Sequence, residues 1–205
     1  MNRIENNPKF KFSMIDNLMF SLSSSMILLY IEEPNWANVR KKAVELNLAQ
    51  KATLSSNDRY VSEALSRLRY LTDGEISYFK GANDQEQRYL LWIALCRSNR
   101  LAREFAIKLL RENFLNYKNK VSFEDYDSFY FDLSSSNEEL DHVSLKMKSK
   151  IRGRIINTAK EANILSKDNF IQPCFLTEQF CKTVAQNSPQ DLLYLPIYEA
   201  DIKGL

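Results

Sequence analysis

Glycine, proline and histidine are scarce in this 205-residue chain, which contains 4 glycines, 5 prolines and a single histidine. Because the turns of all-β proteins consume glycine and proline, so few of them argue against that class. Any Cys/His or Ser/His catalytic pairing would have to use His142, which lies in an acidic stretch typical of a solvated surface.

Motifs that hold phosphates or metals are missing too. No glycine-rich phosphate loop occurs, and the three cysteines with the one histidine lack the close spacing of a structural zinc site. The acids between Asp125 and Asp132 do not fit a calcium loop, because Tyr130 stands where the turn glycine belongs and Ser136 where the bidentate glutamate belongs. We therefore expect no cofactor, no metal and no enzymatic activity.

Long apolar runs are also lacking. The two longest runs fall short of the roughly 20 residues that span a bilayer. They are Leu18 to Ile31, which serines interrupt, and Tyr89 to Cys96. The first residues do not form the apolar core of a signal peptide, and the odd number of cysteines includes no tight pair. These features predict a cytoplasmic protein with reduced thiols and no membrane partner.

Helical patterns dominate what is present. The unbroken apolar run from Tyr89 to Cys96 predicts a helix buried on all sides. From Leu101 to Tyr117, apolar residues recur about every four positions, which predicts an amphipathic helix that packs against the first. With 44% hydrophobic residues, the chain has enough apolar side chains for a sizeable core. We predict an all-α protein, a compact helical bundle forming one domain over residues 1–205, whose lobes would be 1–81 and 82–205.

The remaining elements follow from periodicity and capping residues. Asn35 and Ser122 are expected to cap helices, and Ser55, with Asp58 three residues on, is expected to cap another. Ile164 to Ile171 fits one short β-hairpin, because two apolar pairs flank a polar turn. The other expected helices cover 16–31, 36–46, 57–71, 75–80, 123–133, 144–162 and 177–185.

The charges are arranged in blocks although the formal net charge is only +2. Residues 122–142 contain seven acids and no lysine or arginine, whereas residues 143–160 contain six bases and no acid. Such a basic helix, between a helical segment and a hairpin, fits the recognition helix of a winged helix-turn-helix that binds phosphates. The alternative is a solvated basic face paired with the preceding acidic block. The candidate DNA contacts here are Lys146, Lys148, Lys150, Arg152 and Arg154.

A second helix-turn-helix candidate consists of helix 36–46, the break at 47–54 and the helix that follows. Its turn contains Lys51, and the next helix starts with side chains that contact phosphates and base edges, namely Ser55, Asn57, Arg59 and Tyr60. The break is longer than the three to four residues of the compact motif, so an ordinary helical hairpin is the alternative.

Several segments together resemble the BrxA family of bacterial BREX phage-defence systems. They are Trp36–Arg40, Asn47–Lys51, Ala64–Leu68, Leu90–Cys96, Arg103–Phe105, Phe123–Tyr126, Ile155–Leu165 and Ile171–Pro173. The resemblance implies a compact helical protein that binds double-stranded DNA. It also implies a non-catalytic role beside a methyltransferase and other BREX components. One departure is that Asp16-Asn17 stands where many relatives have a glycine pair.

Two other functions fit the same sequence. The protein would be an interaction scaffold if its basic helix met an acidic partner instead of DNA, or a helical domain that binds RNA or single strands. We expect the isolated chain to be a monomer in each case.

Overall fold

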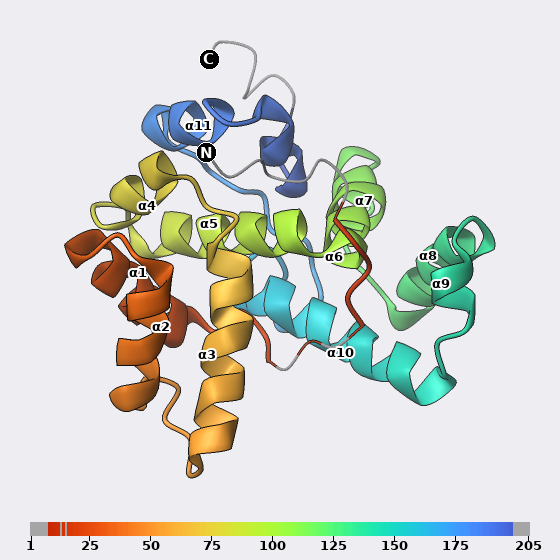
Figure 1. Ribbon diagram of the computed structural model, residues 1–205. Helices are drawn as coiled ribbons and strands as arrows, with labels where there is room; N and C mark the ends of the chain where they lie inside the picture. The colour runs from red at the N-terminus through yellow and green to blue at the C-terminus, as the bar shows by residue number, and fades with distance from the viewer. Residues whose placement is uncertain (1–7, 13, 15, 199–205) are drawn as a thin grey trace.

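Helices form the fold that a computed structural model gives for residues 8–12, 14 and 16–198, and no strand occurs in these ranges. The all-α prediction is therefore confirmed (Figure 1). Two of the elements are not α-helices, since η1 is a π-helix and η2 a 3₁₀-helix. In chain order they are α1 (Phe20–Glu32), α2 (Trp36–Glu45), α3 (Leu54–Leu68), α4 (Asp73–Phe79), α5 (Asp84–Ser98), α6 (Arg100–Glu104), η1 (Phe105–Arg111), α7 (Glu112–Leu115), α8 (Phe123–Ser135), α9 (Glu138–Asp141), α10 (Leu145–Glu161), α11 (Glu178–Ala185) and η2 (Pro189–Tyr194).

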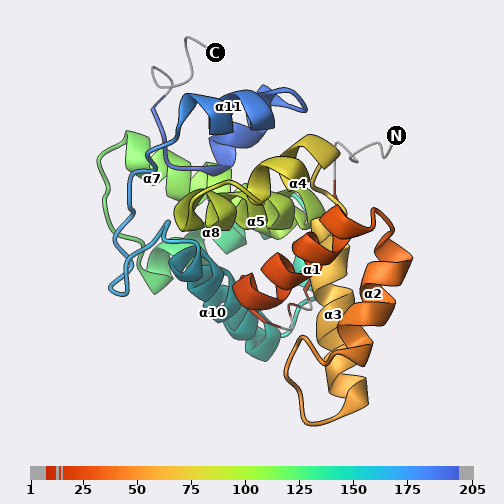
Figure 2. The same ribbon diagram turned by 90° about the vertical axis from the view of Figure 1, so that its left-hand side faces the viewer.

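The middle of the molecule is occupied by α5, with α11 on one side of it and α10 on the other (Figures 1 and 2). Asn83 starts this helix by accepting the backbone N–H of Glu86, and every residue from Tyr89 to Ser98 is buried. A fully buried large apolar side chain stabilises the fold by about 1.5–3 kcal/mol. The predicted buried helix is thus the centre of the core. No helix in the described ranges combines the length and apolar character needed to cross a bilayer.

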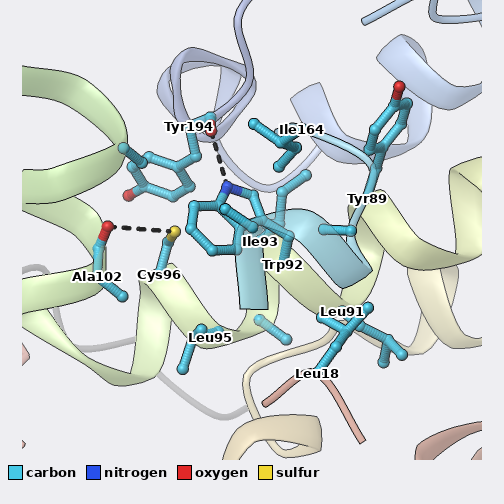
Figure 3. Close-up of a cluster of buried hydrophobic side chains, with 14 of the residues drawn as sticks. Leu18, Tyr89, Leu91, Trp92, Ile93, Leu95, Cys96, Ala102, Ile164 and Tyr194 are labelled. Atoms are coloured by element: carbon cyan, nitrogen blue, oxygen red, sulfur yellow. Dashed lines mark hydrogen bonds between the residues drawn. The ribbon is translucent and has the colours of Figure 1, made fainter. Parts of the chain in front are cut away.

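Two polar atoms within the core around α5 have partners. The indole N–H of Trp92 donates to the carbonyl of Tyr194 at 2.9 Å, and the thiol of Cys96 lies 3.7 Å from the carbonyl of Ala102 (Figure 3). Burial raises the pKa of the Cys96 thiol well above its ordinary value, so this thiol stays protonated. These bonds join α5 to η2 and to α6.

An ion triad that the sequence analysis did not anticipate ties three elements together. Arg97 of α5 is fully buried, with guanidinium nitrogens 2.7 Å from both carboxylate oxygens of Glu75 and 2.8 Å from a carboxylate oxygen of Asp191. Removal of one partner from such a buried pair typically costs 3–5 kcal/mol, because a charge is left uncompensated. The triad links α4, α5 and η2, and so it draws residues from both of the lobes suggested by the sequence.

The first helix starts later than predicted. α1 begins after the Asp16-Asn17 pair rather than at it, because the backbone there is engaged by side chains from other helices. The guanidinium of Arg67 donates to both carbonyls of that pair, at 3.1 and 2.5 Å, and the carboxylate of Glu161 accepts the N–H of Leu18 at 2.9 Å. This entry turn is therefore held between α3 and α10 without glycine.

The predicted caps are mostly confirmed. Asn35 and Ser122 cap α2 and α8, and Ser122 forms a capping box with Asp125. At α3 the prediction is wrong, because Thr53 caps the helix by accepting the N–H of Ser56 at 3.2 Å. Ser55 instead lies inside the first turn.

Two segments differ from their sequence-based description. The predicted helix from Leu101 is interrupted by η1, a seven-residue π-helix that apolar spacing does not distinguish from an α-helix, and it ends at Leu115. The expected hairpin is only a reversal with one bridge, Leu165 to Ile171, and a second bridge to Lys120 before α8. No strand ladder forms in the described residues, so there is no wing of the usual kind.

Candidate nucleic-acid interface

The first half of α10 projects away from the core (Figure 1). Ser144 caps it by accepting the N–H of Met147 at 3.3 Å, and Leu145 is 83% exposed. The first buried residue of α10 is Ile151. Met147, in the first turn, is 37% exposed and lies in a groove between α10 and α3.

Between α3 and α10 lies a groove of about 270 Å³, which we call the basic groove. Figure 2 shows α3 and α10 on the same lower side of the molecule. The two DNA-binding candidates from the sequence, far apart along the chain, therefore contribute to one surface. The groove is lined by Phe12, Met14, Arg59, Tyr60, Met147, Lys150, Ile151 and Arg154.

The positive charges of the basic groove are poorly neutralised. Arg59 and Lys150 are exposed, and neither has an ion-pair partner among the residues that the structure describes. Arg154 is half-buried and lies 3.4 Å from a carboxylate oxygen of Asp16. Lys146, one helical turn before Lys150, is also exposed without a carboxylate partner in the described ranges. The groove and its rim thus present a field that favours anions.

Of the predicted contacts on α3, Asn57 does not face the groove. It is 1% exposed, its amide donates to the carbonyl of Val44 at 2.9 Å, and its side-chain oxygen accepts the N–H of Ala49 at 3.2 Å. Since it fastens the turn between α2 and α3, its expected role in DNA contact is wrong. Ser55, two residues earlier, is exposed in the first turn.

Lys51 and Tyr60 form a pair at the edge of the groove. The ammonium of Lys51 lies 4.0 Å from the centre of the Tyr60 ring, and both residues are half-buried. The side chain of Asn47 holds Lys51 by bonding its backbone N–H and carbonyl, each at 3.1 Å. The helices α2 and α3 run side by side as an antiparallel hairpin (Figure 1), unlike the steep crossing of a compact helix-turn-helix.

The opposite flank of α10 faces different neighbours. Arg152 pairs with the carboxylate of Asp127 at 2.5 Å, and its guanidinium carbon lies 4.6 Å from the centre of the Phe123 ring. The ammonium of Lys148 lies 5.1 Å from the centre of the Tyr130 ring. Lys148 and Arg152 are therefore turned away from the basic groove. For this flank the alternative interpretation holds, a basic face paired with the preceding acidic block.

These two bases belong to a second hollow of about 830 Å³ between α8, α9 and α10, which we call the acidic cleft. Its walls combine aromatic rings, hydroxyl groups and carboxylates. They are formed by Tyr126, Asp127, Tyr130, Phe131, Ser134, Ser135, Ser136, Asn137, Glu138, Asp141, Leu145, Lys148, Ser149 and Arg152.

The two hollows differ in the chemical groups that line them. His142 is exposed just after α9, and in the described part of the chain no three His, Cys, Asp or Glu side chains converge as a metal site requires. The side chains that line the basic groove include no carboxylate, imidazole or thiol. The groove is suited to binding an anion.

Comparison with known proteins places the chain in a family. No match was found among curated proteins. The family model of BrxA, in contrast, matches residues 9–188, which covers most of the chain and includes both walls of the basic groove. The protein is therefore a member of the BrxA family and, as such, a component of a BREX phage-defence system.

Proposed function

We propose that this protein is a non-catalytic, double-stranded-DNA-binding component of its BREX system and that the basic groove is its contact surface. One observation carries the proposal. Arg59 and Lys150 come from segments that are distant in sequence, yet they line the same groove, and both are free of carboxylate partners among the described residues. A backbone of phosphates would neutralise both side chains at once.

The start of α10 adds to this contact. Lys146 and Lys150 stand on one flank of the projecting half-helix, where Ser144 accepts the N–H of Met147 with its hydroxyl and the N–H of Lys148 with its carbonyl. The N–H groups of Leu145 and Lys146 have no partner within the helix, and the helix dipole favours a negative charge beside them. A phosphate placed there would accept hydrogen bonds from the backbone and from a lysine together.

A duplex fits the groove better than a single strand does. Proteins that bind single strands stack the bases on exposed aromatic rings. The aromatic residues of this groove, Phe12 and Tyr60, are half-buried, and the Tyr60 ring is occupied by Lys51. A groove with positively charged side chains and no stacking surface suits the regularly spaced phosphates of double-stranded DNA.

The non-catalytic part of the proposal is supported by the chemistry of the groove. General acid–base or nucleophilic catalysis needs a carboxylate, imidazole, thiol or similarly activated group near the substrate. The lining of the basic groove provides guanidinium, ammonium, phenol and apolar groups instead. We propose that chemistry on the DNA belongs to other BREX components, such as the methyltransferase, and that this chain binds DNA as a monomer when isolated.

The direct test is a titration of a fluorescent duplex with the protein, followed by anisotropy at several salt concentrations. We expect binding that weakens steeply as salt rises, because phosphate contacts release counterions. Competition with unlabelled duplex DNA, single-stranded DNA and RNA of equal length should rank the duplex first. Absence of duplex binding at low salt would favour the scaffold function. Stronger competition by RNA or single-stranded DNA would favour a domain that binds RNA or single strands.

A matched control comes from the same helix. Lys160 lies near the far end of α10, where its ammonium donates to the carbonyl of Lys167 at 2.9 Å. Lys160→Ala removes one positive charge from α10 without touching the basic groove. We therefore expect its affinity for the duplex to equal that of the unchanged protein.

A further inference from the structure

We propose that the acidic cleft docks a partner protein through a segment that carries an apolar side chain flanked by lysine or arginine. This binding site is separate from the basic groove and goes beyond the proposed function. It lies on the flank of α10 that bears Lys148 and Arg152.

The apolar part of the site consists of two exposed side chains, one from α8 and one from α10. Phe131 of α8 is 70% exposed and Leu145 of α10 is 83% exposed, and both line the cleft. Single exposed apolar residues are ordinary, but two at one hollow with aromatic residues beneath them form an anchoring position. The cleft volume of about 830 Å³ admits several side chains of a partner.

The charges in the cleft favour a cation. Glu138 and Asp141 line it, and neither has an ion-pair partner in the described part of the chain. The C-terminal end of α8, at Ser134 to Ser136, adds the negative end of a helix dipole. The two bases in the cleft are already engaged with Asp127 and with the Tyr130 ring. The Lys148 ammonium keeps its positive charge, but the two unpaired carboxylates outnumber it, which disfavours a nucleic acid.

A polypeptide satisfies both features together. A polyamine would meet Glu138 and Asp141 but would leave Phe131 and Leu145 uncovered. A purely apolar ligand would leave the two carboxylates without partners. A partner segment provides a basic side chain and an apolar side chain within a few residues.

The probe is a fluorescent synthetic peptide in which lysines flank a leucine-phenylalanine pair, titrated with the full chain and followed by anisotropy. Two matched peptides serve as controls, one with serines in place of the apolar pair and one with glutamates in place of the lysines. We expect saturable binding of the first peptide and at least about fivefold weaker binding of each control. Equal binding of the serine peptide, or displacement of the first peptide by spermidine at matched charge concentration, would overturn the proposal.

Variants locate the binding within the molecule. Phe131→Ser should weaken peptide binding roughly fivefold to thirtyfold, as expected for loss of an aromatic anchor. The double variant Glu138→Lys, Asp141→Lys should abolish it, because like charges would meet. All three side chains are exposed, so circular dichroism should show an unchanged fold. Peptide binding that survives both variants, or that is lost with Lys150→Ala in the basic groove, would contradict this placement.

Discussion

The two flanks of α10 carry similar charges but lie against opposite neighbours. Lys146 and Lys150 point to the side of α3, where no acid of the described chain pairs with them, whereas Arg152 on the other flank is held by Asp127 at 2.5 Å. Both flanks are basic in the sequence, with Lys146, Lys150 and Arg154 on one and Lys148 and Arg152 on the other. The comparison teaches that a run of bases becomes an anion-binding surface only where the rest of the fold leaves its charge uncompensated.

The cause of the difference is the path of the chain. The acidic residues of 122–142 directly precede α10, so they fold back onto its nearer flank as α8 and α9. The other flank faces α3, which brings Arg59 instead of a carboxylate. The acids next to α10 in the sequence thus neutralise one flank of this helix. The other flank faces α3, which is distant in the sequence and adds positive charge.

Charge reversal should separate the two flanks most strongly. The double variant Arg59→Glu, Lys150→Glu places two carboxylates in the basic groove, and like-charge juxtaposition costs several kcal/mol. We expect duplex affinity to fall roughly a hundredfold or more in an anisotropy titration. The matched reversal in the acidic cleft, Glu138→Lys with Asp141→Lys, should preserve affinity. Equal losses for both double variants would remove the distinction between the flanks.

A buried residue near the groove should affect stability rather than binding. Asn57→Ala leaves the carbonyl of Val44 and the N–H of Ala49 without their partner. We expect the free energy of unfolding in urea to fall by about 1–3 kcal/mol. Duplex affinity at a temperature where the variant is folded should stay unchanged. Lower affinity with unchanged stability would restore Asn57 to the DNA contact.

Arg59 should show the reverse pattern. It is exposed and lies off the apolar side of α3, so Arg59→Ala should leave the urea midpoint unchanged. An arginine that contacts DNA contributes about 1–3 kcal/mol, and affinity should fall accordingly. Arg69→Ala, at the exposed residue that follows the other end of α3, is the control. If Arg69→Ala weakened duplex binding as much as Arg59→Ala, the DNA contact would not be confined to the N-terminal end of α3.

The smallest effect is expected on the neutralised flank. Arg152→Ala removes an ion pair whose Asp127 side chain is 61% exposed, and such pairs contribute less than about 1 kcal/mol. We expect a slight loss of thermal stability and no change in duplex affinity. Arg152→Lys should recover the stability only in part, since lysine lacks the planar group that packs on Phe123. A clear loss of DNA binding here would extend the contact to both flanks.

The sequence predicts the fold well because local signals agree with the global structure. The run Tyr89 to Cys96 is apolar throughout and is therefore expected in the core, where it lies. Asn35 and Ser122 cap their helices through hydrogen bonds to residues that follow closely in the sequence. η1 could not be predicted in this way, because a π-helix keeps the apolar spacing of an α-helix. Nor could the triad around Arg97, because its partners come from distant parts of the chain.

The candidate site could be predicted only in part. Residue type and periodicity identify Arg59 and the flank of Lys146 and Lys150, but they do not reveal that the two surfaces meet. Asn57 has the chemistry of a base contact and is used to fasten a turn. The acidic cleft could not be predicted from the sequence, because it exists only once α8 and α9 are placed against α10. The acidic block that contributes to its walls is evident in the sequence.

The most direct test of the account is the salt dependence of duplex binding by the double variant Lys146→Ala, Lys150→Ala. Both residues are exposed, so the variant should fold normally. The slope of log affinity against log salt should become shallower by about two, because two phosphate contacts no longer release counterions. Lys160→Ala, measured alongside, should keep the slope of the unchanged protein. A double variant that retained both affinity and slope while Lys160→Ala lost them would contradict the placement of DNA in the basic groove.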